Sequence, residues 1–267
     1  MVRKVIGLME RSTLLAAKNV LIMGVANQRS IAWAIAKVMY SAGAKLAFTY
    51  QNERLKDKVS KLVEAEAPGS LILPCDVSAD DQIENLAAEL KKEWGILHGV
   101  VHSLAFAKHE ELSGLYANTS REGFLLAQNI SAYSLVALAR NLYPLMSDGG
   151  SIITMTYNGS QRVVPNYNVM GVAKASLEAS VRYLASDLGP FGIRVNAISA
   201  GPIRTVSAKG VKDFNRLLEG VEEKTPLRRL ATAEDVAGAA LFLASDLSSA
   251  VTGTIVYVDS GQHMMSV

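Results

Sequence analysis

The stretch "NVLIMGVANQRSIAWAIA", residues 19–36, joins an apolar run to a helical pattern through one glycine. Residues 19–24 are typical of a strand buried on both faces, and residues 31–42 are predicted to form a helix. A turn at Gly24 would lead to helix amides near Ser30 and Ile31 that could hold a pyrophosphate. The motif G-x-G-x-x-G is absent, because Ala26 and Ser30 stand where further glycines are expected. An ordinary strand–helix turn with Ser30 as N-cap therefore remains an alternative.

The same strand–helix unit repeats along the chain. Further strands are predicted at residues 45–50, 71–75, 99–103, 151–157, 194–199 and 254–258, and further helices at 53–67, 80–94, 120–146, 167–188 and 233–245. Alternating strands and helices, with near-continuous apolar strands, indicate a parallel sheet that helices cover on both faces. We therefore predict a single doubly wound α/β domain of Rossmann type, spanning residues 1–267, with seven strands.

One segment is longer than a crossover helix requires. It separates the sixth predicted strand from the seventh, at residues 200–253, and begins at the carboxyl edge of the sheet. Insertions at this edge commonly close over a ligand, so a substrate lid is predicted at about residues 203–222. Phe214 lies on the apolar side of an amphipathic pattern within it. An ordinary packed helix is the alternative.

Composition narrows the class of protein. The 267 residues carry a net charge of +2 without a long Lys/Arg run, which does not indicate nucleic-acid binding. No apolar run approaches the roughly 18 residues of a membrane span. The only cysteine, Cys75, excludes an internal disulfide and suits a reducing cytosol, so a cytoplasmic protein is expected. The spacing of the four histidines, which are His98, His102, His109 and His263, predicts no metal site.

Polar or small residues follow four neighbouring strands, in "GVANQ", "TYQNER", "CDV" and "HSLAFA". Carboxyl ends of parallel strands line a ligand crevice at the switch point of a doubly wound sheet. Asp76 could bind an adenine amine there, although a turn aspartate is an equal alternative, and the small Ala105 would let a ribose approach the backbone. Neutral Gln51 occupies the position at which an acidic residue would bind the adenosine ribose or an arginine would bind a 2′-phosphate. Arg54 and Lys56 remain within reach of a phosphate, but no strong phosphate clamp is evident, which favours NADH over NADPH.

A second stretch, "TYNGSQRVVPNYNVMGVAK" at residues 156–174, offers two tyrosines and a lysine. Tyr167 and Lys174 are seven residues apart, close to two helical turns, so a helix would place them on one face. A phenol is protonated at neutral pH and can donate to a developing oxyanion, while an ammonium can bind a ribose. The pair suits hydride reduction of a carbonyl or conjugated enone. A chance surface pairing is the alternative.

These residues resemble the short-chain dehydrogenase/reductase superfamily and, within it, the enoyl-acyl-carrier-protein reductases of bacterial fatty acid synthesis. Most of the superfamily carries Tyr-x-x-x-Lys, but Met170 occupies that tyrosine position here. The enoyl reductases carry Tyr-x6-Lys, as in "PNYNVMGVAKASLEASVRYLA". The segments "GVANQRSIAWAIA", "FTYQNERL", "CDV", "VHSLAFA", "SREGFLLAQNISAYS", "RVNAISAGPIRT" and "VDSG" also match in order. The division of the family common in Gram-positive bacteria fits best.

The resemblance implies NADH-dependent reduction of the trans-2 double bond of enoyl-acyl-carrier-protein thioesters by a homotetramer. By it, Tyr167 binds the thioester carbonyl, Lys174 holds the nicotinamide ribose, and Tyr157 borders the substrate. The positions matching NAD contacts are Gly24, Ser30, Ile31, Gln51, Asp76, Val77, Ser103, Ala105, Lys174, Ile203 and Thr205. Ala107 and Phe214 match the substrate side, together with Tyr157.

The sequence departs from the family in places. Relatives usually read Tyr-Leu-Gly after the fifth strand, whereas Asn158 follows Tyr157 here, and the ends of the chain also fit poorly. A ketoreductase or sugar dehydrogenase of the same superfamily is one alternative, and Met170 argues against it. A non-catalytic NAD-binding sensor is another, and the presence of Tyr157, Tyr167 and Lys174 argues against that.

Overall fold

The computed structural model describes residues 13–203 and 220–265. Its sheet has seven parallel strands in the order β3-β2-β1-β4-β5-β6-β7, which confirms the predicted doubly wound architecture. The strands are β1 (Asn19–Met23), β2 (Lys45–Tyr50), β3 (Leu71–Pro74), β4 (Gly99–His102), β5 (Gly150–Thr156), β6 (Ile193–Ala200) and β7 (Ile255–Val258). The strand order reverses between β1 and β4, so the switch point lies at their carboxyl ends.

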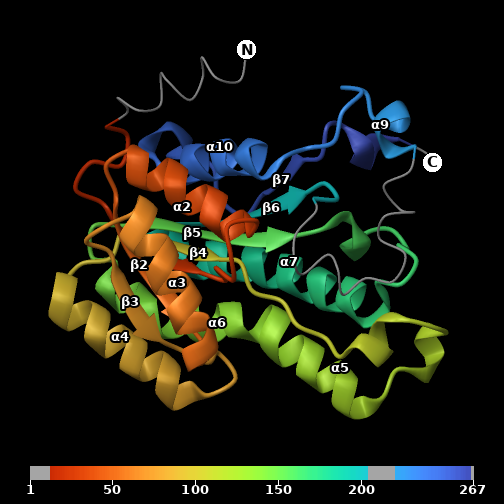
Figure 1. Cartoon of the computed structure of the whole chain (residues 1–267), viewed down its shortest axis with the longest axis horizontal. Helices are drawn as coiled ribbons and strands as arrows, with labels where there is room; N and C mark the ends of the chain where they lie inside the picture. Colours follow the sequence, from red (N-terminus) through yellow and green to blue (C-terminus); the bar gives the residue numbers. More distant parts are fainter. Residues whose placement is uncertain (1–12, 204–219, 266–267) are drawn as a thin grey trace.

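Helices cover both faces of the sheet (Figure 1). One face carries α2 (Ile31–Ser41), α3 (Glu53–Glu66) and α10 (Ala233–Ala244), whose apolar side chains share a core cluster with β1 and β2. The other carries α4 (Asp80–Trp94), α6 (Ser134–Leu142) and α7 (Asn168–Leu188), which form a second cluster that includes Cys75. These two layers bury the strands on both faces, as their continuous apolar sequence requires.

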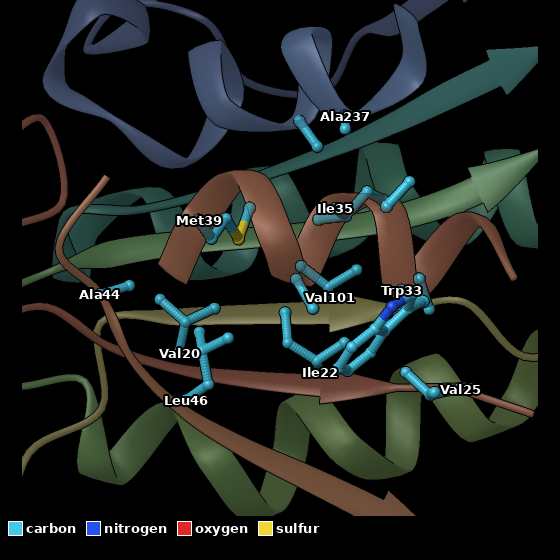
Figure 2. Packing of buried hydrophobic residues seen from close by; sticks show 14 of the residues in the cluster. Val20, Ile22, Val25, Trp33, Ile35, Met39, Ala44, Leu46, Val101 and Ala237 are labelled. Carbon is cyan, nitrogen blue, oxygen red and sulfur yellow. The ribbon is translucent and has the colours of Figure 1, made fainter. Parts of the chain in front are cut away.

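The packing of α2 on the sheet holds the first strand–helix unit together. Trp33 is fully buried, and its ring lies 5.7 Å from that of Phe48. Figure 2 shows Trp33 and Ile35 of α2 close to Ile22 and Val101 of the strands beneath. This apolar contact orients the N-terminus of α2 relative to the end of β1.

The predicted continuous helix at residues 120–146 is wrong in its middle. The chain forms α5 (Arg121–Gln128), a π-helical segment (Asn129–Tyr133), α6, and a 3₁₀ turn (Tyr143–Leu145). Two serine hydroxyls, one within the π segment and one directly after it, form hydrogen bonds with residues at the end of β4 and just beyond it. Ser131 Oγ accepts from the Phe106 amide at 3.0 Å, and Ser134 Oγ lies 2.8 Å from His102 Nε2. The wider turn brings both serines to this strand end.

Most of the predicted lid, residues 203–222, lies outside the described residues, as do Thr205 and Phe214. The chain is described again from Gly220, which has a φ of 72° and precedes the short helix α9 (Val221–Lys224). Within residues 13–203 and 220–265, none of the helices combines the length and apolar character needed to cross a membrane.

Candidate functional site

The switch point brings the ends of β1 and β4 into close contact. Gly24 has a φ of 95°, and a Cβ added there would lie 2.0 Å from the Ser103 carbonyl oxygen. Only glycine fits this approach. The Ser30 hydroxyl, predicted as a possible helix cap, instead accepts from the amides of Ala26 and Asn27 at 3.0 and 3.1 Å. It thereby closes the β1–α2 loop.

The second and third strand ends are also joined. Gln51 Nε2 donates to Asp76 Oδ2 at 2.9 Å, while Asp76 Oδ1 accepts from the Ser78 amide and hydroxyl at 2.9 and 2.7 Å. Burial disfavours the Asp76 carboxylate, but these hydrogen bonds outweigh it, so the pKa of Asp76 lies below its usual value. Asp76 therefore stabilises its own turn and fixes Gln51, and its contact with an adenine amine stays a prediction.

The remaining predicted cofactor contacts differ in exposure. Val77 is buried in the second core cluster. Ala105 is exposed beside the β4 end. Ile203 follows β6 and packs against the first core cluster. Each of the three follows the carboxyl end of a strand, β3, β4 or β6, and their contact with a dinucleotide stays a prediction.

The two tyrosines form an edge-to-face pair. Tyr157 follows β5 and Tyr167 precedes α7, and their ring centroids are 5.1 Å apart at an interplanar angle of 73°. Gly159 makes this approach possible, since a Cβ there would lie 2.5 Å from Tyr167 Cδ1. Burial, with the charge of Asp259, raises the pKa of Tyr157, and burial raises the pKa of Tyr167 strongly. Both phenols therefore stay protonated donors at neutral pH.

Lys174 is buried two turns into α7, and its ammonium donates to the Met155 carbonyl at 2.8 Å. Burial lowers the pKa of Lys174 to about 8, against the opposing charge of Glu178. Burial, and then the charge of Lys174, lowers the pKa of His102 to about 3. His102 is thus a neutral residue that lies between the hydroxyls of Thr154 and Ser134.

Tyr167 and the predicted substrate position Ala107 share an apolar neighbourhood. Both pack against a small apolar cluster of Leu112, Ala127, Val169, Met170 and Ala173. Met170, which replaces the tyrosine of most superfamily members, is thus part of the wall beside Tyr167 and is buried. An apolar wall next to a phenol donor suits a substrate with a hydrocarbon chain and a polar carbonyl.

The sequence reading assigned no role to two buried carboxylates near the tyrosines. Asp259, after β7, accepts from the amides of Gly261 and His263 and contacts the His263 ring at 3.0 Å. Glu178 lies on α7, one turn after Lys174, and accepts from hydroxyls on both sides of Tyr157. The spacing of four residues from Lys174 was a signal for Glu178, whereas only the folded chain brings Asp259 to Tyr157.

A dinucleotide fits these residues. The amides of Ile31 and Ala32 open helix α2 and take no hydrogen-bond partner within the described chain, which leaves donors for a pyrophosphate. Gly24 leaves no side chain between the β1 and β4 ends, and exposed Ala105 leaves room beside them. The Lys174 ammonium lies at the end of β5, where it donates to the Met155 carbonyl.

Comparison with known proteins gives a consistent result. A family model described as Enoyl-(Acyl carrier protein) reductase matches residues 24–263. The enoyl-[acyl-carrier-protein] reductase [NADH] of Bacillus cereus is 58% identical over 253 residues, 94% of this chain and 99% of the relative. A Staphylococcus aureus enzyme named for NADPH is 53% identical over 247 residues, 92% and 96% of the two chains. A crystal structure of the Bacillus cereus enoyl-acyl carrier protein reductase with NADP+ and indole naphthyridinone aligns with a TM-score of 0.93 at 57% identity. The alignment covers 95% of this chain and 99% of that chain.

Proposed function

The chain belongs to the enoyl-(acyl carrier protein) reductase family and reduces the double bond of enoyl thioesters in fatty acid synthesis, and we propose that Tyr157, Tyr167 and Lys174 carry this reaction. The observation that best supports these roles is the pair of protonated phenols at the start of α7, the helix that also carries the buried Lys174 ammonium. The reaction requires a donor to an oxyanion, a group that holds the cofactor, and a dry acyl pocket.

When bound, the reduced nicotinamide supplies a hydride to C3 of the trans-2-enoyl thioester. Negative charge then develops on the thioester oxygen, and the Tyr167 hydroxyl donates a hydrogen bond to it. Tyr157 packs against the acyl chain and aids delivery of the proton that C2 takes up. Lys174 binds the nicotinamide ribose, and Gly24, Ser30, Ile31 and the β4 end hold the rest of the dinucleotide.

The activity is tested by the fall in NADH absorbance with crotonyl-CoA and with an enoyl acyl carrier protein. We expect reduction of both substrates, and higher kcat/KM with the carrier protein, which is the partner that the family's name implies. Acetoacetyl-CoA is the control, because a ketoreductase would reduce it. If the protein reduced acetoacetyl-CoA but not crotonyl-CoA, the enoyl reductase assignment would be rejected.

The family uses NADH or NADPH, since relatives named for each match this chain. We propose a preference for NADH here. Three features beside the adenosine ribose support it: Gln51 is bound to Asp76, Glu53 is exposed, and Lys56 Nζ already pairs with Glu53 Oε2 at 3.2 Å. A 2′-phosphate would meet an acidic neighbour and an occupied lysine.

The Glu53→Gln variant should therefore raise kcat/KM with NADPH several-fold and leave the value with NADH near wild type. The change removes one negative charge and frees Lys56 to bind a phosphate. Glu64→Gln, which removes an exposed carboxylate farther along the same helix, is the matched control. A wild-type kcat/KM that is equal or higher with NADPH contradicts the proposed preference.

A homotetramer is proposed from exposed apolar side chains on the helices at residues 120–146 and 167–188. Leu125 on α5 and Tyr183 on α7 are 60% and 75% exposed, and Tyr133 and Val172 are also exposed. Pairing of these helices about two-fold axes would bury these side chains.

Light scattering should give four times the monomer mass, and the Leu125→Glu variant should have a lower mass. Leu115→Glu is the control, because Leu115 is 73% exposed but lies outside these helices, and a wild-type monomer refutes the proposal.

The location in the cell is proposed to be cytoplasmic. The only cysteine, Cys75, is a free thiol that is buried in the core, where burial raises its pKa to about 12. A protein whose single thiol is unpaired and unreactive needs no oxidising compartment. Fractionation of cells that produce the protein would test this location.

A further inference from the structure

Glu178 is a buried carboxylate with an unusual set of partners. It is only 5% exposed and follows Leu177 of the second core cluster on α7. One oxygen, Oε1, accepts from the Thr156 hydroxyl at 2.7 Å and from the Ser160 hydroxyl at 2.5 Å. A buried charge needs such donors, because an unpaired carboxylate would be costly to remove from water.

The two donors stand on either side of Tyr157. Thr156 ends β5, and Ser160 ends the 3₁₀ turn (Asn158–Ser160) that follows Tyr157. The Ser160 amide also donates to the Tyr157 carbonyl at 3.0 Å. A single carboxylate oxygen of α7 therefore holds both ends of the backbone segment that carries this phenol.

The same turn determines where Tyr167 lies. Gly159, between the two anchored ends, contacts the Tyr167 ring, and its carbonyl oxygen lies close to Gly171 of α7. A shift of the turn would move Tyr157 and the surface against which Tyr167 packs. The 5.1 Å separation of the two rings thus depends on the position of the turn.

Resting on the enoyl reductase function, we propose that Glu178 is a positioning residue for the reaction. Its carboxylate fixes the Tyr157 turn against α7, and so fixes the two phenols relative to each other and to Lys174. It reaches neither thioester nor dinucleotide in this role. It acts through the hydroxyls of Thr156 and Ser160.

The charge of Glu178 has a second consequence. The described elements bring His102, Tyr157, Tyr167 and Asp259 to this region; the first three are neutral at neutral pH, and the charge of Asp259 acts on Tyr157. Glu178 supplies the negative charge that raises the pKa of Lys174 against the effect of burial. Loss of that charge should move the pKa of Lys174 downward from about 8. The ammonium would then be lost at lower pH, and activity with it.

Two variants separate the parts of the proposal. Thr156→Val with Ser160→Ala removes both donors but keeps the charge, and Glu178→Gln keeps an acceptor but removes the charge. Ser180→Ala is the control, because its hydroxyl lies on α7 and donates only to the Ser176 carbonyl. Each is measured for kcat, for KM of crotonyl-CoA, for the pH profile with NADH, and for thermal unfolding.

The double variant should lower kcat roughly ten- to a hundredfold, as displaced catalytic groups do, with the basic limb of its pH profile unchanged. Glu178→Gln should lower kcat and move that limb to lower pH, and Ser180→Ala should match wild type. A wild-type kcat in the folded double variant overturns the proposal. So does a Glu178→Gln variant whose pH profile keeps the basic limb of wild type. If Glu178→Gln does not fold, the double variant decides. Wild type that fails to reduce crotonyl-CoA instead rejects the enoyl reductase function itself.

Discussion

The Tyr167→Phe variant should fold normally and lose about a hundred- to a thousandfold in kcat/KM for enoyl thioester reduction. The expected loss corresponds to about 2.7–4 kcal/mol of transition-state stabilisation, the contribution of one oxyanion donor. The phenyl ring would keep its edge-to-face contact with Tyr157 and its packing against the apolar cluster that includes Met170. Only the hydroxyl would be lost, so the effect should appear mainly in kcat.

Steady-state kinetics with crotonyl-CoA at saturating NADH measures this loss. Tyr183→Phe is the matched control, since Tyr183 lies on the same helix with 75% of its surface exposed. Burial raises the pKa of Tyr167 far above neutrality. The pH profile of wild-type activity should therefore show no fall caused by ionisation of this phenol across the ordinary assay range. Wild-type turnover in folded Tyr167→Phe would remove Tyr167 from the reaction.

The Gly24→Ala variant should have the largest effect on stability, a loss of roughly 3–5 kcal/mol in the free energy of unfolding. A methyl group at this position would lie 2.0 Å from the Ser103 carbonyl oxygen, and the φ of 95° is unfavourable for alanine. Neither obstacle can be relieved by a side-chain rotation, because both involve backbone of the two central strands. The ends of β1 and β4 would have to separate.

Denaturant unfolding measures this change, with Gly114→Ala as the control. Gly114 also has a positive φ, of 76°, but a Cβ there would have nothing within 4 Å. It should cost about 1–2 kcal/mol, from backbone conformation alone. The difference between the variants isolates the contact with Ser103. Equal losses would mean that this contact does not constrain the crevice. NADH binding should also weaken in Gly24→Ala only.

The strand and helix pattern was accessible from the sequence because burial on both faces leaves continuous apolar runs. Each predicted strand is found within one or two residues of its expected bounds, and the parallel order follows from the alternation with helices. The helix that carries Lys174 was also predicted, beginning at Tyr167 where the structure begins it at Asn168. The spacing of these two residues is a local property of the chain.

The π segment at Asn129–Tyr133 could not be predicted from residues 120–146 alone. Its amphipathic pattern is that of an ordinary helix, and the wider turn places Ser131 and Ser134 against Phe106 and His102. Those partners are distant in sequence. Glu178 is a similar case, since its hydroxyl partners come from β5 and the following turn. Nothing within α7 indicates them.

By itself, the sequence determined the parallel α/β fold, the family, and the tyrosine and lysine placed two turns apart. Those features depend on burial and spacing, which neighbouring residues encode. Only the tertiary structure decided that Lys174 bonds to the Met155 carbonyl, that Asp76 is a turn aspartate bound to Gln51, and that Tyr157 meets Tyr167 edge to face. These contacts join separate strands and helices, and their geometry is set by packing of the whole domain.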